Sequence, residues 1–170
     1  MIRRLKGMEM NIHPEARLAE NASLIGAVTV EKGANIWYGA VLRGDCGTIT
    51  VGENSAVEDN CALHGAVTIG KNCIIGHGAI LHSCTLRDGV LIGMGATVMD
   101  GAVIGEGSLV AAGALVTKNT VVPPGCVVMG IPARIKGQVS PAQSEQIKDG
   151  ALFYRELAEE QLPLWETAAM

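Results

Sequence analysis

Aromatic residues are scarce in this 170-residue chain: phenylalanine, tyrosine and tryptophan make up 3% of it, although 48% of its residues are hydrophobic. A core with so few rings must consist of aliphatic and small side chains, which suits a narrow interior. The chain also lacks an excess of basic residues, because its formal net charge is −4. This charge argues against nucleic acid or an anionic membrane as a partner.

Long apolar segments are missing as well. No apolar run approaches the roughly 20 residues of a membrane-spanning helix. The first ten residues include Arg3, Arg4 and Lys6 but no apolar stretch typical of a signal peptide. We therefore expect a cytoplasmic protein.

The sequence does contain a short repeat. Twenty aliphatic residues recur every six positions, and the spacing changes only twice, by three extra residues after Leu42 and by one fewer after Leu81. They are Ile12, Leu18, Leu24, Val30, Ile36, Leu42, Val51, Val57, Leu63, Ile69, Ile75, Leu81, Leu86, Ile92, Val98, Ile104, Val110, Val116, Val122 and Val128. A small or compact residue follows most of them four places later, from Ala16 to Pro132. Such a period indicates a solenoid, in which each unit buries its apolar residue by stacking on its neighbours.

Hexads of this kind predict flat, extended sides joined at corners. The aliphatic position and the small position four residues later both point inward, because side chains alternate along an extended segment. Three hexads close a triangular coil of 18 residues, and about seven such coils would stack over residues 12–133 to give an all-β parallel β-helix with one core. The winding sense of the coil does not follow from the repeat.

The chain on either side of the repeat has a different character. Residues 1–11 form a lead-in, and residues 134–170 form a linker and a C-terminal helix that packs on the coils. Ser140 to Gln143 matches a capping box with Pro141 at the first helical position. Ile147, Ala151, Tyr154 and Ala158 then recur at helical spacing. We expect Gly150 to kink or split this helix and Pro163 to lie just beyond its end.

The five cysteines allow a disulfide or a zinc site. However, Cys46, Cys61, Cys73 and Cys126 all occupy the small inward position, and Cys84 lies beside the second change of spacing. Buried free thiols behave as small hydrophobic residues, so we interpret these cysteines as part of the core.

Three of the four histidines lie between positions 64 and 82. His64 and His82 each follow an aliphatic position directly and are one 18-residue coil apart, so their rings should stack on one outward face about one strand spacing apart. His77 belongs to a different side of the triangle and should point away from this pair. Chains related by a threefold axis would bring His77 of one subunit to His64 and His82 of the next. Such a homotrimer would hold a metal ion with three histidines and one open position.

Arg43 extends the same column. Counting through the three extra residues places Arg43 beneath His64, and Asp45 follows two residues later. A charge in a subunit contact needs a partner. We therefore expect an Arg43–Asp45 ion pair that crosses the contact; a solvated surface pair is the alternative.

These residues carry a resemblance. The segments Val41-Leu42-Arg43-Gly44-Asp45, Leu63-His64, and Gly76-His77 through Leu81-His82 are similar to those of the γ-class carbonic anhydrases of the hexapeptide-repeat superfamily. The resemblance implies a left-handed β-helix and a homotrimer with Zn2+ (or Fe2+ or Co2+) between subunits. His64 and His82 would come from one chain and His77 from its neighbour. It also implies reversible hydration of CO2 to bicarbonate by a metal-bound hydroxide.

The chain departs from that family at three points. Ala56-Val57-Glu58-Asp59 stands where the family usually has Asn-x-Gln-Asp, so Glu58 replaces the Gln that orients the hydroxide and is a candidate general base. His64 runs directly into the next hexad, without the acidic loop of the best-studied members. Tyr154 matches a tyrosine commonly found on the terminal helix and is a candidate site residue.

Two other functions are compatible with these features. The same scaffold supports acyl-CoA transferases and thioesterases; the transferases use a single histidine as general base and need no set of three. A trimer in which the metal serves only to clasp the subunits together is the other alternative.

Overall fold

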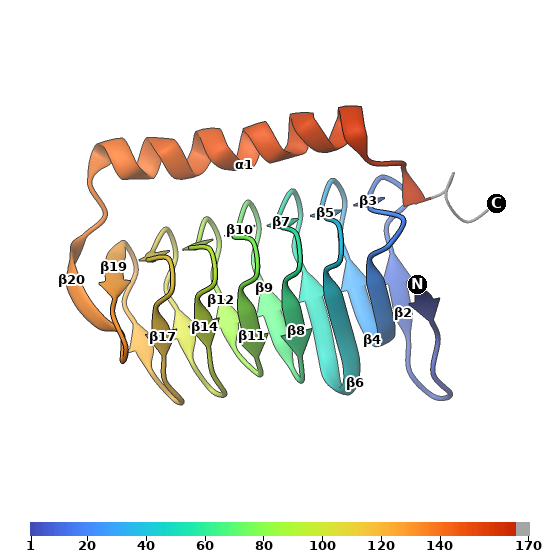
Figure 1. Ribbon diagram of the computed structural model, residues 1–170, viewed down its shortest axis with the longest axis horizontal. Helices are drawn as coiled ribbons and strands as arrows, with labels where there is room; N and C mark the ends of the chain where they lie inside the picture. The colour runs from blue at the N-terminus through green and yellow to red at the C-terminus, as the bar shows by residue number, and fades with distance from the viewer. Residues whose placement is uncertain (166–170) are drawn as a thin grey trace.

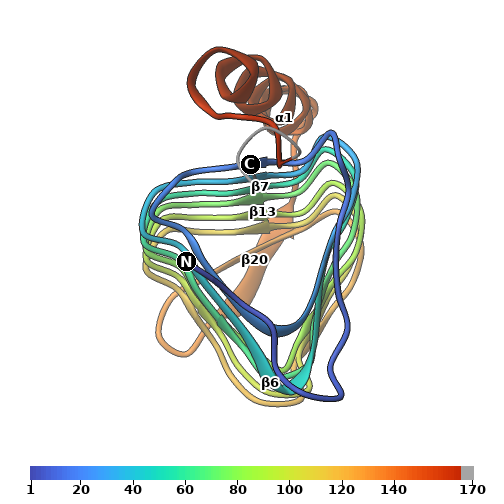
Figure 2. The ribbon, with the colours of Figure 1, turned by 90° about the vertical axis from the view of Figure 1, so that its right-hand side faces the viewer.

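The computed structural model describes residues 1–165. It shows about seven triangular coils stacked along one axis, with a single long helix lying along the stack (Figure 1). Viewed along that axis, the coils superimpose as nested triangles and the helix lies over one of the three sides (Figure 2). The last five residues of the predicted C-terminal segment, 166–170, lie outside the described residues.

Two sheets form the three sides, and their strand pairs are parallel except for the final pair, β19 and β20. The first side contains the first half of β6, followed by β8, β11, β14 and β17. The second side contains the second half of β6, followed by β9, β12, β15 and β18. β4 and β6 run around the corner between these two sides. The strands of this 12-stranded sheet are β1 Ile2–Arg3, β2 Met10–Ile12, β4 Ser23–Val30, β6 Val41–Val51, β8 Ala62–His64, β9 Val67–Ile69, β11 Ile80–His82, β12 Thr85–Leu86, β14 Thr97–Val98, β15 Val103–Ile104, β17 Leu115–Val116 and β18 Val121–Val122.

The third side is an eight-stranded sheet. Its strands are β3 Arg17–Leu18, β5 Asn35–Ile36, β7 Ala56–Val57, β10 Ile74–Ile75, β13 Leu91–Ile92, β16 Leu109–Val110, β19 Cys126–Met129 and β20 Arg134–Gln138.

The hexad positions form the core, as predicted. Nineteen of the twenty are buried, and the remaining one, Ile12, is partly buried and packs against the others. Equivalent positions pair across the coils, so that Leu42 is opposite Leu63 and Leu63 is opposite Leu81. Side chains one residue before and after these positions therefore point away from the interior of the triangular coils, here called the bore, on all three sides.

Two small positions do not point inward. Cys46 is exposed, whereas the other four cysteines are buried free thiols. Cys46 lies within the three extra residues between Leu42 and Val51, where the chain turns the corner and the six-residue alternation is interrupted. Pro132 is also exposed, because the last coil ends with β19 and the chain then turns back.

The helix α1 spans Pro141–Gln161 and begins at a capping box formed by Ser140 and Gln143. It runs without interruption through Gly150 (Figure 1), so the predicted kink or split at this residue is wrong. A Cβ atom on Gly150 would lie 2.9 Å from the Ile74 Cδ1 atom on the third side. Gly150 therefore allows the helix to approach the coils closely. Within residues 1–165, no helix is both long and apolar enough to span a membrane.

The segments outside the repeat also contribute strands. β1 and β2, in the predicted lead-in, pair with β4. β20, in the predicted linker, pairs antiparallel with β19. These strands add hydrogen-bond partners at the two ends of the stack, where coil backbone groups would otherwise be unpaired.

Candidate metal centre

The first half of the candidate site is the pair of stacked histidines on the first side. His64 ends β8 and His82 ends β11, and the two residues are directly opposite each other in the parallel register. The His64 Nδ1 atom lies 3.2 Å from the His82 Nε2 atom, and the ring centroids are 5.1 Å apart. The column predicted from the sequence is therefore present, with Arg43 opposite His64 in the preceding coil.

An aspartate lies behind each of these two rings. Asp45 Oδ1 is 3.1 Å from His64 Nε2, and Asp100 Oδ1 is 3.1 Å from His82 Nδ1. A neutral imidazole has one N–H donor and one lone pair, and a carboxylate accepts the donor. The two nitrogens that face each other, His64 Nδ1 and His82 Nε2, then each carry a lone pair and no proton. Two lone pairs 3.2 Å apart repel each other, so this arrangement calls for a cation between or beside them, either a proton or a metal ion.

The separation of the two facing nitrogens fits a metal ion. Zn–N bonds of roughly 2.0–2.1 Å in a tetrahedral site place two ligand nitrogens about 3.3 Å apart, close to the 3.2 Å between His64 and His82. A carboxylate hydrogen-bonded to the far nitrogen of a histidine ligand is the usual means of fixing its tautomer and orientation.

Arg43 and Asp45 form an ion pair within one chain, with 2.7 Å between Arg43 Nη1 and Asp45 Oδ2. The pair forms without a second subunit, and whether it also crosses a subunit contact stays a prediction. The Arg43 hydrogen bond lowers the pKa of Asp45. Arg43 therefore favours the charged carboxylate that His64 contacts.

The second half of the site lies at the corner between the third and first sides, where His77 follows β10. His77 Nδ1 is 2.9 Å from Asp59 Oδ2, and His77 Nε2 is 3.1 Å from Glu58 Oε2. Tyr154 of α1 reaches the same ring, with its hydroxyl oxygen 3.4 Å from Nε2. Because Asp59 accepts the Nδ1 proton, Nε2 remains to bind a cation or to accept a hydrogen bond.

Glu58 points away from the bore, as its position after Val57 predicts, yet only 3% of it is exposed. Its Oε2 atom accepts the backbone N–H of His77 at 2.9 Å. Burial raises the pKa of Glu58, and the charge of His77 and a hydrogen bond from Tyr154 oppose this shift. Burial raises the pKa of Tyr154 too, helped by the negative charge of Glu58, so the phenol remains a hydrogen-bond donor.

The sequence analysis missed Asp100 and the role of Asp59. Asp100 follows His82 by 18 residues, and Asp59 precedes His77 by 18 residues. The coil count that aligned His64 with His82 places Asp59 level with His77. The next coil is one residue shorter, with Leu81 opposite Val98, so Asp100 lies one residue beyond the position opposite His82. Each of the three histidines thus has an aspartate that holds it from behind.

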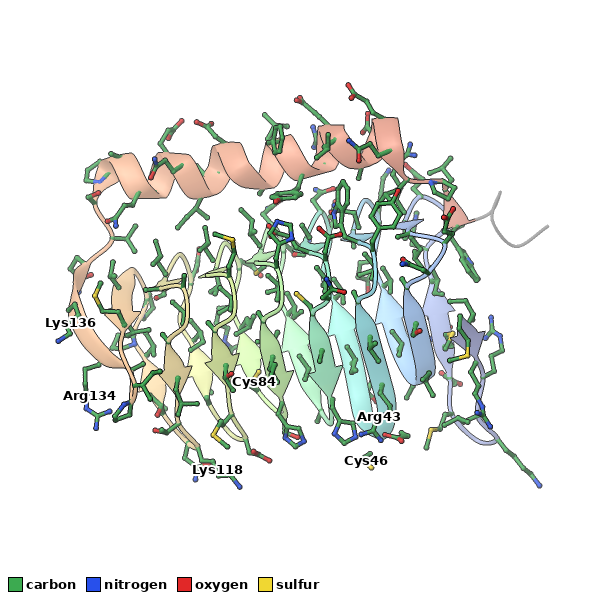
Figure 3. All side chains as sticks on the ribbon, viewed as in Figure 1. Arg43, Cys46, Cys84, Lys118, Arg134 and Lys136 are labelled. Atoms are coloured by element: carbon green, nitrogen blue, oxygen red, sulfur yellow. The ribbon has the colours of Figure 1, made fainter. Side chains whose placement is uncertain are left out.

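The structure brings the six histidine and aspartate residues together as two half-sites rather than one site. His64 and His82 contact Asp45 and Asp100, whereas His77 contacts Glu58, Asp59 and Tyr154. Figure 3 shows Arg43 and Cys46 at the edge of the coils opposite α1, which carries Tyr154. The first side of the triangle lies between the two half-sites.

Comparison with known proteins identifies the family. A family model described as the GMPPB C-terminal domain matches residues 45–144. The chain is 40% identical over 152 residues to a "Probable carbonic anhydrase" of Methanocaldococcus jannaschii, an alignment that covers 87% of this chain and 96% of that protein. It is 42% identical to the mitochondrial "Gamma carbonic anhydrase 1" of Arabidopsis thaliana over 51% of this chain and 35% of that protein.

Solved structures agree on the architecture. The crystal structure of a hexapeptide transferase family protein from Anaplasma phagocytophilum superimposes with a TM-score of 0.91 at 40% identity, and the match covers 95% of this chain and 97% of that one. The predicted fold class, a left-handed parallel β-helix with a C-terminal helix, is confirmed. The match to the archaeal protein covers 87% of this chain, whereas the family model covers residues 45–144. The chain therefore belongs to the γ-class carbonic anhydrase-like proteins of the hexapeptide-repeat superfamily.

Proposed function

We propose that this protein is a metal-dependent carbonic anhydrase that hydrates CO2 reversibly to bicarbonate at a three-histidine site shared between subunits of a homotrimer. The observation that carries the proposal is the pair of facing nitrogens of His64 and His82, 3.2 Å apart, with an aspartate behind each ring. The γ-carbonic anhydrases, to which the chain is similar, are metal-dependent, and Zn2+, Fe2+ or Co2+ all suit imidazole ligands.

The third ligand in this proposal is His77 of a neighbouring subunit. Within one chain, the His77 half-site and the His64/His82 half-site lie at opposite edges of the first side. A threefold axis facing this side would bring the edge of one subunit against the opposite edge of the next, and three such contacts close a ring.

The surface of the first side supports this assembly. Val41, Ala62 and Ile80 form one outward column in consecutive coils. Val41 is 38% exposed and Ile80 is 47% exposed in the single chain. An apolar column flanked by polar half-sites has the composition of a subunit contact.

The roles of the residues follow from their positions. A divalent ion at this donor set supplies acidity to water, which makes hydroxide available near neutral pH. His64, His82 and the neighbouring His77 hold the ion, and Asp45, Asp100 and Asp59 fix the three imidazole rings in the required tautomers. Arg43 keeps Asp45 charged and oriented.

Glu58 is assigned to proton transfer. Its Oε2 atom lies beside His77 Nε2, the atom that would bind the ion, so it is within reach of water at the same position. Glu58 would accept the proton of the attacking water as general base. Tyr154 donates a hydrogen bond to this carboxylate and, by covering it, limits the access of bulk water. With no acidic loop after His64, proton release to solvent depends on Glu58 and Asp59.

Metal analysis of anaerobically purified protein, combined with stopped-flow CO2 hydration, tests the proposal. We expect one ion per chain in the wild type, and its loss in both His77→Ala and His82→Ala. His13→Ala is the matched control, since His13 lies in neither half-site and should leave metal content and rate unchanged. Full metal content in both site variants would refute the three-histidine site.

A second comparison separates the proposed chemistry from the alternatives. Glu58→Gln should keep the metal but change the hydration rate, and an unchanged rate would remove Glu58 from the mechanism. Assays of acetyl transfer from acetyl-CoA and of acyl-CoA hydrolysis on the same samples should show no activity that depends on His64 or His82. A metal-loaded wild type without CO2 hydration would favour a structural clasp.

A further inference from the structure

The three-residue insertion between Leu42 and Val51 turns Cys46 outward at the corner between the first and second sides. Of the five cysteines, all of which lie within residues 1–165, Cys46 alone is exposed. The ligand atoms of Asp45, Cys46 and His64 all lie within 4.8 Å of one another. Figure 3 shows Cys46 beside Arg43, at the edge of the coils farthest from α1.

These three side chains offer one sulfur, one nitrogen and one oxygen donor. Zinc accepts all three, with bonds of about 2.3 Å to sulfur and 2.0–2.2 Å to nitrogen or oxygen, and thiolate favours zinc and softer ions over magnesium or calcium. The insertion lies at the surface, so the Cys46 side chain can rotate toward an ion. All three donors belong to one chain, and no second subunit is required.

His64 links this cluster to the proposed catalytic centre. Its Nδ1 atom faces His82, and its Nε2 atom faces Asp45 at 3.1 Å. A neutral imidazole has a single lone pair, so it binds an ion through one nitrogen at a time. When an ion binds Nε2, the ring proton lies on Nδ1, which then has no lone pair for an ion at His82. When an ion binds Nδ1, the proton lies on Nε2, which then cannot bind an ion beside Asp45 and Cys46.

We propose that Asp45, Cys46 and His64 form a second metal site, selective for zinc and softer divalent ions, that competes with the three-histidine site for His64. On binding, the Cys46 thiol releases its proton to solvent, the His64 ring proton moves from Nε2 to Nδ1, and the Arg43 guanidinium remains paired with the second oxygen of Asp45. The second site fills only with added metal and does not retain an ion through purification, so His77→Ala is purified without metal, whereas excess zinc or cadmium would inhibit the enzyme. The competition rests on the proposed function, whereas the site itself does not.

Cadmium binding tests the site directly, because a cadmium–thiolate bond gives an ultraviolet charge-transfer absorption. We would titrate CdCl2 into full-length His77→Ala, which lacks the third ligand of the proposed catalytic centre. The absorption should saturate at one cadmium per chain. It should disappear in His77→Ala/Cys46→Ser and persist in His77→Ala/Thr48→Ser, a control in the same exposed strand. Absence of the band in His77→Ala, or its persistence without Cys46, would overturn the proposal.

The wild type tests the competition. Zinc bound at the three-histidine site should weaken cadmium binding at Cys46 by at least tenfold relative to His77→Ala. Equal cadmium affinity with full retention of zinc would refute the sharing of His64. If instead the wild type retains no metal through His77 while the Cys46-dependent band remains, the proposed function fails and the second site stands.

Discussion

Replacement of Asp100 is the sharpest test of how the histidine pair is held. Asp100 accepts one hydrogen bond in the site, at its Oδ1 atom from His82 Nδ1 at 3.1 Å. Loss of such a carboxylate behind a histidine ligand weakens metal binding by about 10–100-fold. Because the Asp100 side chain is 39% exposed, water can take its place in part. We therefore expect Asp100→Ala to fall near the lower limit, about tenfold.

The companion variant Asp100→Asn separates charge from orientation. The amide oxygen still accepts the Nδ1 proton, so the tautomer of His82 is preserved and only the negative charge is lost. We expect a loss of affinity smaller than that of Asp100→Ala. Lys118→Ala is the control, because Lys118 contacts Asp100 only at 3.8 Å and does not contact His82.

Competition with a chelator of known affinity measures these changes, with the secondary structure of each variant checked in parallel. The reasoning is wrong if Asp100→Ala retains the metal as tightly as the wild type. It is also wrong if Asp100→Asn loses more affinity than Asp100→Ala, because orientation of His82 would then not be the function of Asp100.

Two further predictions concern stability. Burial raises the pKa of Cys61 from 9.0 to about 12. Between pH 9 and 11 the folded chain therefore keeps a thiol proton that the unfolded chain loses. The free energy of unfolding should fall by about 1.4 kcal/mol per pH unit per thiol over this range. Urea unfolding of Cys61→Ala at these pH values should show a shallower fall, and an equal slope would contradict this. Gly150→Ala should raise the free energy of unfolding by up to about 1 kcal/mol through helix propensity, because only the end of the Ile74 side chain must move. A decrease in the free energy of unfolding by more than about 1 kcal/mol would show that the Ile74 side chain cannot move aside.

The repeat predicted most of the fold because each hexad reports directly on which side chains face the bore. It also placed Arg43, His64 and His82 in one column, since in-register stacking converts sequence distance into spatial position. The count failed at Cys46, where the insertion interrupts the alternation. It could not show that Glu58 is buried, because that burial comes from α1 packing over the third side. Gly150 was misjudged for a similar reason: its local preference for bending is overridden by close packing against Ile74.

Under the proposed function, the position of the two half-sites couples metal binding to subunit assembly. His77 contacts Glu58 and Asp59 at one edge of the first side, whereas His64 and His82 meet at the other, so a single chain offers two ligands to an ion at His82 but not three. Under the proposed function, the ion binds the assembled form more tightly than the single chain and stabilises it by mass action. The site based on Cys46 needs one chain only. The affinity of the three-histidine site should therefore depend on protein concentration, and the affinity of the Cys46 site should not.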